Sequence, residues 1–326
     1  MKTRVIVTCL IGLGLAGCSK NLEVVPQTSL SSATFFTQEA DFKQAVNAAY
    51  VPLRPIFNDR DWLLGEMHSD NTYYFRNILF GATEQQENIA DFSLPTSNGL
   101  TTNTHVLNEY RLLYQIIARA NQVLSAIDKV EFNATSKANL KGQAQFLRAF
   151  AYFKLVQYFG KVPLHLTPVT NRQEAAAPLA SVEDLYKQIE GDAKAAVQGL
   201  FVKSKQEAGR ATAGAAKTLL ANLYLVQKRW ADAEAISKEV IASNEYSLMT
   251  NYADAFSGTN SNKNNAESVF EVQFMEGSAG YNGTLIYNFL PRPMTAAELL
   301  PITGVANPQA LSGEGNNAPT PDIIAA

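Results

Sequence analysis

The sequence predicts a mainly helical protein, built from stacked helical hairpins and followed by an irregular, partly β C-terminal portion. Apolar residues recur at intervals of three and four along residues 37–250, which is the period of helices with one buried face. Further on, Phe270, Val272 and Phe274 alternate with polar residues, which is the period of a strand. We therefore expect a helical domain over 37–250 and a mixed portion over 251–326.

Two helices are expected in the N-terminal third, with a long irregular segment between them. Pro52 and Pro55 end or kink the first, because proline lacks the amide proton that a helix interior needs. Asn121 is the lone polar residue on the apolar face of the second. The first apolar face comprises Phe42, Ala45, Val46, Ala49, Tyr50 and Leu53, and the second comprises Tyr110, Leu113, Tyr114, Ile117, Leu124 and Ile127.

The next two helices have clear ends in the sequence. The third covers Lys137 to Phe159, and Gly160 and Pro163 follow it as stop signals. The fourth opens at Ser181, which has Asp184 three residues later, the spacing of a capping box with the shorter acid.

The clearest helical pair runs from Lys217 to Val240 and is tetratricopeptide-like. Trp230 opens its second helix, and we expect this ring to take part in helix packing. One hairpin of this kind cannot bury its own apolar face, so the upstream helices are expected to stack on it. The residues at the tetratricopeptide spacing are Leu220, Ala221, Tyr224 and Ala233.

The C-terminal portion has weaker signals. Leu285 to Phe289 predicts a second short strand, and residues 303–326 predict irregular chain because proline, glycine and asparagine are frequent there. Asn262 to Glu267 offers oxygen atoms for a calcium ion but lacks the spaced acids and the glycine of an EF-hand loop.

The N-terminus is typical of a bacterial lipoprotein signal. Lys2 and Arg4 form a basic region, an apolar run follows, and Leu15-Ala16-Gly17-Cys18 closes it with small residues before a cysteine. We expect residues 1–17 to be removed, Cys18 to be acylated, and residues 18–36 to form a tether. The alternative is an ordinary secretory signal with an incidental cysteine.

Composition excludes several classes of function. Loss of Lys2 and Arg4 with the signal takes the formal net charge from −3 to −5, so nucleic acid is not an expected partner. The two cysteines are Cys9, inside the signal, and Cys18, so neither thiol catalysis nor a cysteine-ligated metal is expected. We expect no cofactor, no metal and no catalytic residue.

Residues 145–164, QFLRAFAYFKLVQYFGKVPL, resemble the hallmark segment of the SusD/RagB family. Further segments resemble that family in the same order along the chain. They are Cys18 with Leu22-Glu23 and Pro26, Phe35 to Tyr50, Ile117 to Val123 with Asn121, Gly209 to Thr212 before Ala216 to Leu225, and Glu267 to Val272.

This resemblance implies a nutrient-binding lipoprotein of the Bacteroidota outer membrane. Such a protein captures glycan at the cell surface without catalysis and delivers it to a SusC-type TonB-dependent transporter. Members of the family are usually longer, and Pro319 to Asp322 resembles a segment inside them, so the resemblance implies a truncated chain.

A glycan site needs flat aromatic faces for sugar rings, with carboxylates, amides or arginine for the hydroxyls. The irregular segment between the first two helices supplies all of these, and a second set follows residue 280. The alternative is that Tyr73 or Phe75 fills the core beneath the first segment. The first set is Asp70, Asn71, Tyr73, Tyr74 and Arg76, the second is Tyr281, Tyr287 and Arg292, and Trp62 joins either.

Four other patterns do not indicate a site. Residues 12–17 fit the dinucleotide fingerprint GxGxxG but lie in the signal, where no strand precedes them. The three histidines, His68, His105 and His165, have no zinc-site spacing. Glu84, Glu87 and Asp91 are explained by a solvated helix face without glycosidase chemistry, and the 262–267 oxygens lack the calcium spacing given above.

The sequence thus leaves two functions open. The first is a surface glycan-binding lipoprotein, and the second is a lipid-anchored periplasmic scaffold that holds a protein partner on its helical stack.

Overall fold

The computed structural model describes residues 35–74, 84–93, 103–256, 262–275, 281–283, 285–289, 295–303, 318–320 and 324. The signal, the tether up to residue 34 and Cys18 lie outside these residues. The chain divides into Met1–Thr37 and Gln38–Ala326, and all the helices discussed below belong to the second unit.

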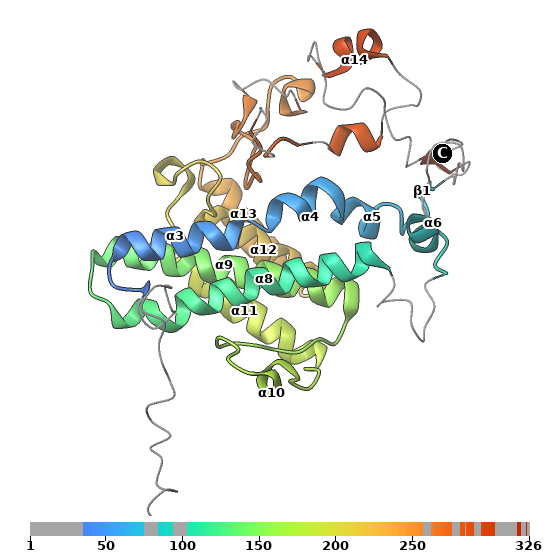
Figure 1. Cartoon of the computed structure of the whole chain (residues 1–326). Coiled ribbons are helices and arrows are strands. Elements are labelled where there is room, and N and C mark those ends of the chain that lie inside the picture. Colours follow the sequence, from blue (N-terminus) through green and yellow to red (C-terminus); the bar gives the residue numbers. More distant parts are fainter. Residues whose placement is uncertain are drawn as a thin grey trace, which may run out of the picture. The chain divides into compact units, whose positions relative to one another are not determined.

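Six long helices form the body of the protein as stacked hairpins (Figure 1). Successive helices pack side by side: α8 on α9, α9 on α11, α11 on α12, and α12 on α13, while α3 packs on both α8 and α9. The predicted helical array is therefore confirmed. The six are α3 (Glu39–Tyr50), α8 (Thr104–Ala126), α9 (Ala134–Phe159), α11 (Val182–Gly199), α12 (Ala213–Val226) and α13 (Trp230–Ala242).

The helix ends follow from local chemistry. A short polar side chain at the N-cap accepts a backbone hydrogen bond from the first turn, which satisfies a donor that has no partner inside the helix. Asn103 does this for α8, Asn133 for α9, Ser181 for α11 and Thr212 for α12. At the other end of α9, Gly160 takes φ of 66°, which glycine adopts without steric cost.

Short elements connect and extend this body. β1 and β2 pair antiparallel, with Thr72 opposite Pro319. None of the helices in the described part has the length and hydropathy that a bilayer crossing requires. The short elements are α4 (Leu53–Asp59), α5 (Asp61–Gly65), β1 (Thr72–Tyr73), α6 (Glu84–Ala90), η4 (Ile127–Lys129), α10 (Arg172–Ala175), η5 (Lys203–Lys205), η6 (Tyr252–Phe256), η8 (Leu285–Asn288), α14 (Ala296–Thr303) and β2 (Ala318–Pro319).

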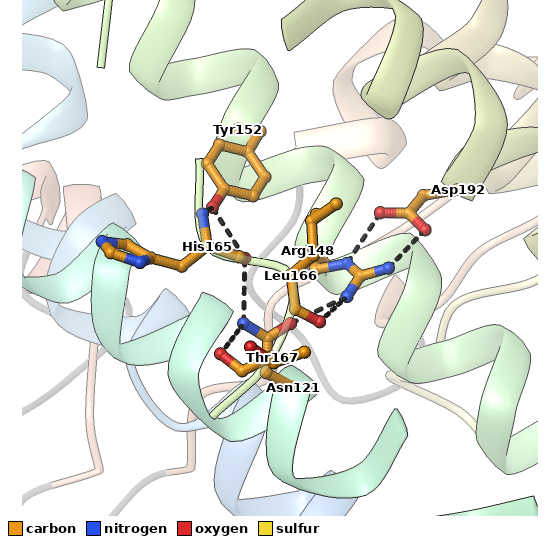
Figure 2. A network of polar contacts seen from close by, with 7 residues as sticks. All are labelled: Asn121, Arg148, Tyr152, His165, Leu166, Thr167 and Asp192. Carbon is orange, nitrogen blue, oxygen red and sulfur yellow. Dashed lines mark hydrogen bonds and ion pairs between the residues drawn. The ribbon is translucent and has the colours of Figure 1, made fainter. Parts of the chain in front are cut away.

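A buried polar network joins three helices and one loop (Figure 2). The Arg148 guanidinium on α9 forms two hydrogen bonds of 2.8 Å with the Asp192 carboxylate on α11. It also donates to Asn121 Oδ1 on α8 at 2.8 Å and to the Leu166 carbonyl at 3.2 Å. Asn121 in turn donates to the carbonyl of His165 at 2.9 Å. The polar residue that interrupts the α8 stripe therefore anchors the loop after α9.

Two glycines allow α9 and α11 to cross closely. A Cβ atom on Gly199 would lie 2.6 Å from the backbone carbonyl oxygen of Ala138, and one on Gly142 would lie 3.1 Å from the Leu200 backbone nitrogen. Real Cβ atoms do not approach a carbonyl oxygen this closely, so a side chain at Gly199 would push the helices apart.

Four expectations from the sequence are wrong. The segment between the first two predicted helices is not irregular throughout, because it contains α4, α5 and α6. Residues 270–274 form an extended segment without strand pairing, because Phe270 packs on helices: its ring lies 5.3 Å from Phe146 and 6.4 Å from Tyr50. Leu285–Asn288 is a 3-10 helix rather than a strand. Trp230 is 61% exposed and does not fill the α12–α13 interface, which small Ala233 occupies instead.

We expect Gly199→Ala to lower the free energy of unfolding by about 1–3 kcal/mol, because the α9–α11 crossing must open. Gly191→Ala on the same helix is the matched control, since nothing lies within 4 Å of its Cβ position. That control should gain about 0.5–1 kcal/mol. Urea denaturation of both variants checks the opposite signs, and a stabilised Gly199→Ala protein would contradict the close crossing.

Asp192→Asn should lower the free energy of unfolding by about 3–5 kcal/mol, because it leaves the buried Arg148 charge without its counter-ion. The comparison is Lys238→Ala, which removes an exposed ion pair with Glu234 and should change stability little. Denaturation midpoints measure the stability of both variants. Equally small losses of stability would show that the buried Arg148–Asp192 pair contributes no more than the exposed one.

Candidate ligand-binding surface

Two of the predicted residues, Tyr281 of the second set and Trp62, make ring contacts at α4 and α5, with partners that the sequence did not single out. The Arg54 guanidinium of α4 lies over the Tyr281 ring at 4.2 Å, and Trp62 of α5 meets Phe289 edge to face with ring centroids 5.0 Å apart. Tyr281 is 45% exposed, so its ring remains available to a ligand. Each pair joins residues that are more than 200 positions apart, and we call the two pairs together the α4–α5 surface: Arg54, Trp62, Tyr281 and Phe289.

A cavity of about 340 Å³ lies beside this surface. One wall is the end of α3 and the start of α4, and the other is the extended segment 270–275. Its size falls in the range of small-molecule sites, and its walls combine aromatic rings with a guanidinium. The lining includes Tyr50, Arg54, Phe270, Phe274, Met275 and Tyr281.

The first predicted set is only partly at the surface. Asp70 and Asn71 are exposed, and their backbone carbonyls accept hydrogen bonds from Thr320 at 2.9 Å. Tyr74 is 7% exposed and packs in a small apolar cluster with Leu63, Met67, Ile89 and Val106. Tyr74 thus fills the core, whereas the alternative interpretation named Tyr73 or Phe75, whose side chains lie outside the described residues.

The side chains of the remaining predicted residues lie outside the described part of the structure. Arg76, Arg292 and Cys18 lie outside the described residues. Tyr73 is described only as part of β1 and Tyr287 only as part of η8.

A partly buried charged cluster lies at α5, and sequence reasoning missed it. Lys154 Nζ on α9 lies 2.5 Å from Asp61 Oδ1, and the Tyr158 hydroxyl donates to the same oxygen at 2.7 Å. Glu109 on α8 is 0% exposed. Burial, and then the nearby Asp61 charge, raise the pKa of the Glu109 carboxyl to about 7. The signal in the sequence was an acid on the apolar stripe of α8, four positions before Leu113.

A lysine occupies the loop that offered oxygen atoms for calcium. Lys203 Nζ donates to the backbone carbonyls of Asn265 at 2.7 Å, Ala266 at 3.2 Å and Ser268 at 2.8 Å. Burial lowers the pKa of this ammonium, while Glu271 and Glu245 oppose the shift. Across the described residues, no group of three or more His, Cys, Asp or Glu side chains is placed to hold a metal ion.

The arrangement suits binding by contact. Ring faces offer apolar area to one face of a sugar, while the Arg54 guanidinium offers donors for hydroxyls.

Comparison with known proteins identifies the family. A family profile described as "Starch-binding associating with outer membrane" matches residues 20–225, which is more than half of the chain. The chain belongs to the SusD-like family. Residues 145–164, which resemble the family hallmark, supply the α9 side chains Arg148 and Lys154 described above.

SusD-like relatives agree over most of this chain. A SusD-like protein of Bacteroides ovatus is 27% identical over 84% of this chain and 50% of its own length, and SusD-like protein P38 of Formosa agariphila is 29% identical over 74% and 46%. The chain spans about half the length of these curated relatives.

Solved SusD-like structures share the fold. A laminarin-binding SusD-like protein superimposes with a TM-score of 0.70 at 25% identity, covering 88% of this chain and 63% of its own. Surface glycan-binding protein A of Bacteroides thetaiotaomicron, solved with laminarihexaose, gives 0.70 at 19% identity over 88% and 60%.

Stability of this SusD-like chain should depend on pH through Glu109. The folded-state pKa is about 7 and the unfolded value 4.5, so the folded protein holds the proton more tightly. Its contribution is therefore present at low pH and is lost as pH rises from about 4.5 to 7, by up to about 3 kcal/mol. Glu109→Gln should remove this loss, as denaturation at pH 5 and pH 8 would show. An equal pH dependence in both proteins would mean that another group is responsible.

Proposed function

We propose that this protein binds neutral glycan without catalysis at the α4–α5 surface. The single observation that carries the proposal is that the Arg54–Tyr281 and Trp62–Phe289 pairs place aromatic rings at the consecutive helices α4 and α5, with Arg54 and Tyr281 lining a cavity, in a chain of the SusD-like family. The relatives described as binding laminarin or solved with laminarihexaose support carbohydrate as the ligand class.

Within the proposed site, the structure supports the residues unequally. Tyr281 and Trp62 contribute rings, and Asp70 and Asn71 contribute exposed polar groups. Arg76, Tyr73, Tyr287 and Arg292 stay in the proposal from the sequence alone. Tyr74 has the least support, because a buried ring offers little area to a sugar.

We further propose that Cys18 carries the lipid anchor and that the protein works at the cell surface with a SusC-type TonB-dependent transporter. The description of the family as associating with the outer membrane supports this location. A non-catalytic role is supported because the similar proteins are described as binding glycans. Binding alone requires neither a nucleophile nor a pair of carboxylates at a catalytic separation.

Tyr281→Ala should weaken binding to the recognised polysaccharide about tenfold, which corresponds to about 1.4 kcal/mol of lost ring contact. Affinity electrophoresis in gels containing laminarin, starch or other neutral polysaccharides measures the retention. Tyr252→Ala is the control, because Tyr252 is 78% exposed on η6 and lies outside the proposed surface.

Three results would count against this proposal: retention unaffected by Tyr281→Ala, no retention by any neutral polysaccharide, or release of reducing sugar. Circular dichroism should show the same helical signal in all variants.

A scaffold that binds a protein partner is the second candidate. It is favoured by the apolar residues that α13 exposes, Trp230 and Ile241 among them. Protease treatment of intact cells separates the two functions, because only a surface protein is degraded in cells that are not permeabilised.

A further inference from the structure

Glu109 is a buried acid for which the fold provides no counter-charge in contact. Neither carboxylate oxygen has a hydrogen-bond partner among the described residues, although the side chain is fully buried. The indole Nε1 of Trp62 is also buried without a partner there. An unsatisfied carboxylate in a protein interior is costly, so such a group calls for an explanation.

Charged and polar groups on α5 and α9 act electrostatically on Glu109 without a hydrogen bond to it. They are Arg60 and Asp61 at the start of α5 and Lys154 and Tyr158 on α9. On α8 itself, His105 stands one turn before Glu109. Asp61 raises the pKa of Glu109, whereas Lys154 and Arg60 lower it.

The Lys154 ammonium acts on both Asp61 and Glu109: it pairs with Asp61, and its charge lowers the pKa of Glu109. Its ammonium holds Asp61, the first residue of α5, and so fixes this short helix to α9. The next residue along α5 is Trp62, whose ring meets Phe289 on the α4–α5 surface. The Lys154–Asp61 pair therefore lies one residue from the Trp62 ring.

We propose that Glu109 is a positioning residue for Trp62, acting through competition with Asp61 for the Lys154 ammonium. When Glu109 is protonated, Lys154 serves Asp61 alone and α5 is held in place. When Glu109 is ionised, two carboxylates share one ammonium, the hold on Asp61 weakens, and the Trp62 ring shifts. The consequence for ligand binding rests on the proposed function, whereas the movement of Trp62 does not.

Trp62 itself can report on this coupling. The chain has two tryptophans, so Trp230→Phe leaves Trp62 as the sole indole. The emission of this single-tryptophan protein should titrate between pH 5.5 and 8.5 with one midpoint near 7, the pKa of Glu109. When Glu109→Gln is added, the emission should no longer depend on pH and should stay at the value that the parent shows at low pH.

Two controls isolate the carboxyl. Histidines also titrate in this range, so His105→Gln should keep the titration and its midpoint if Glu109 is responsible. Glu183→Gln, at an exposed position of α11, should also leave it unchanged. Because Glu109→Gln could affect folding, Glu109→Met gives a second neutral side chain of similar size, and circular dichroism checks both.

The proposal is overturned if the emission of Trp62 does not change over this range, or if the change persists after Glu109→Gln. If retention by a polysaccharide is found as above, it should weaken over the same pH range in the parent and not in Glu109→Gln. A titrating Trp62 in a protein that retains no polysaccharide would refute the proposed function and leave the positioning role intact.

Discussion

The arginine at position 148 is the constraint on which the helical stack depends. A guanidinium inside a protein must have its charge and its donors satisfied together, and here the partners are Asp192 of α11, Asn121 of α8 and a carbonyl of the loop after α9. The arginine can be satisfied only when all of these elements are in register. The network therefore selects one arrangement of the stack among those that the apolar stripes alone would allow.

The same helix organises the candidate site from its other side. Arg148 faces α11, while Lys154, less than two turns later, reaches Asp61 of α5. α9 thus has two charged residues with different roles: Arg148 joins the stacked helices, and Lys154 holds α5, which contributes Trp62 to the α4–α5 surface. The segment that resembles the family hallmark lies mostly in α9. It contributes to the packing of the helices and to the support of α5, and it supplies no ring of the α4–α5 surface.

Local signals in the sequence predicted the helices well, because a stripe at intervals of three and four and a capping residue act within a few positions. The N-caps Ser181 and Thr212 and the stop at Gly160 are of this kind, although only the first and last were anticipated. The alternation around Phe270 failed as a strand signal because an extended chain pairs only if another strand lies beside it, and here helices do. Pairings such as Arg148 with Asp192, Arg54 with Tyr281 and Trp62 with Phe289 join distant residues, so no local pattern could reveal them. Trp62 and Tyr281 were singled out by residue type alone, and their meeting on α4–α5 is a product of the fold.

The cradle around Lys203 has its own consequence. Three backbone carbonyls of the 265–268 turn converge on a primary ammonium that belongs to the chain, and the Tyr246 ring lies 4.9 Å from the same nitrogen. A covalently attached ammonium occupies this position in every molecule, whatever the ionic composition of the solvent. This turn therefore keeps its shape without a dissolved divalent ion.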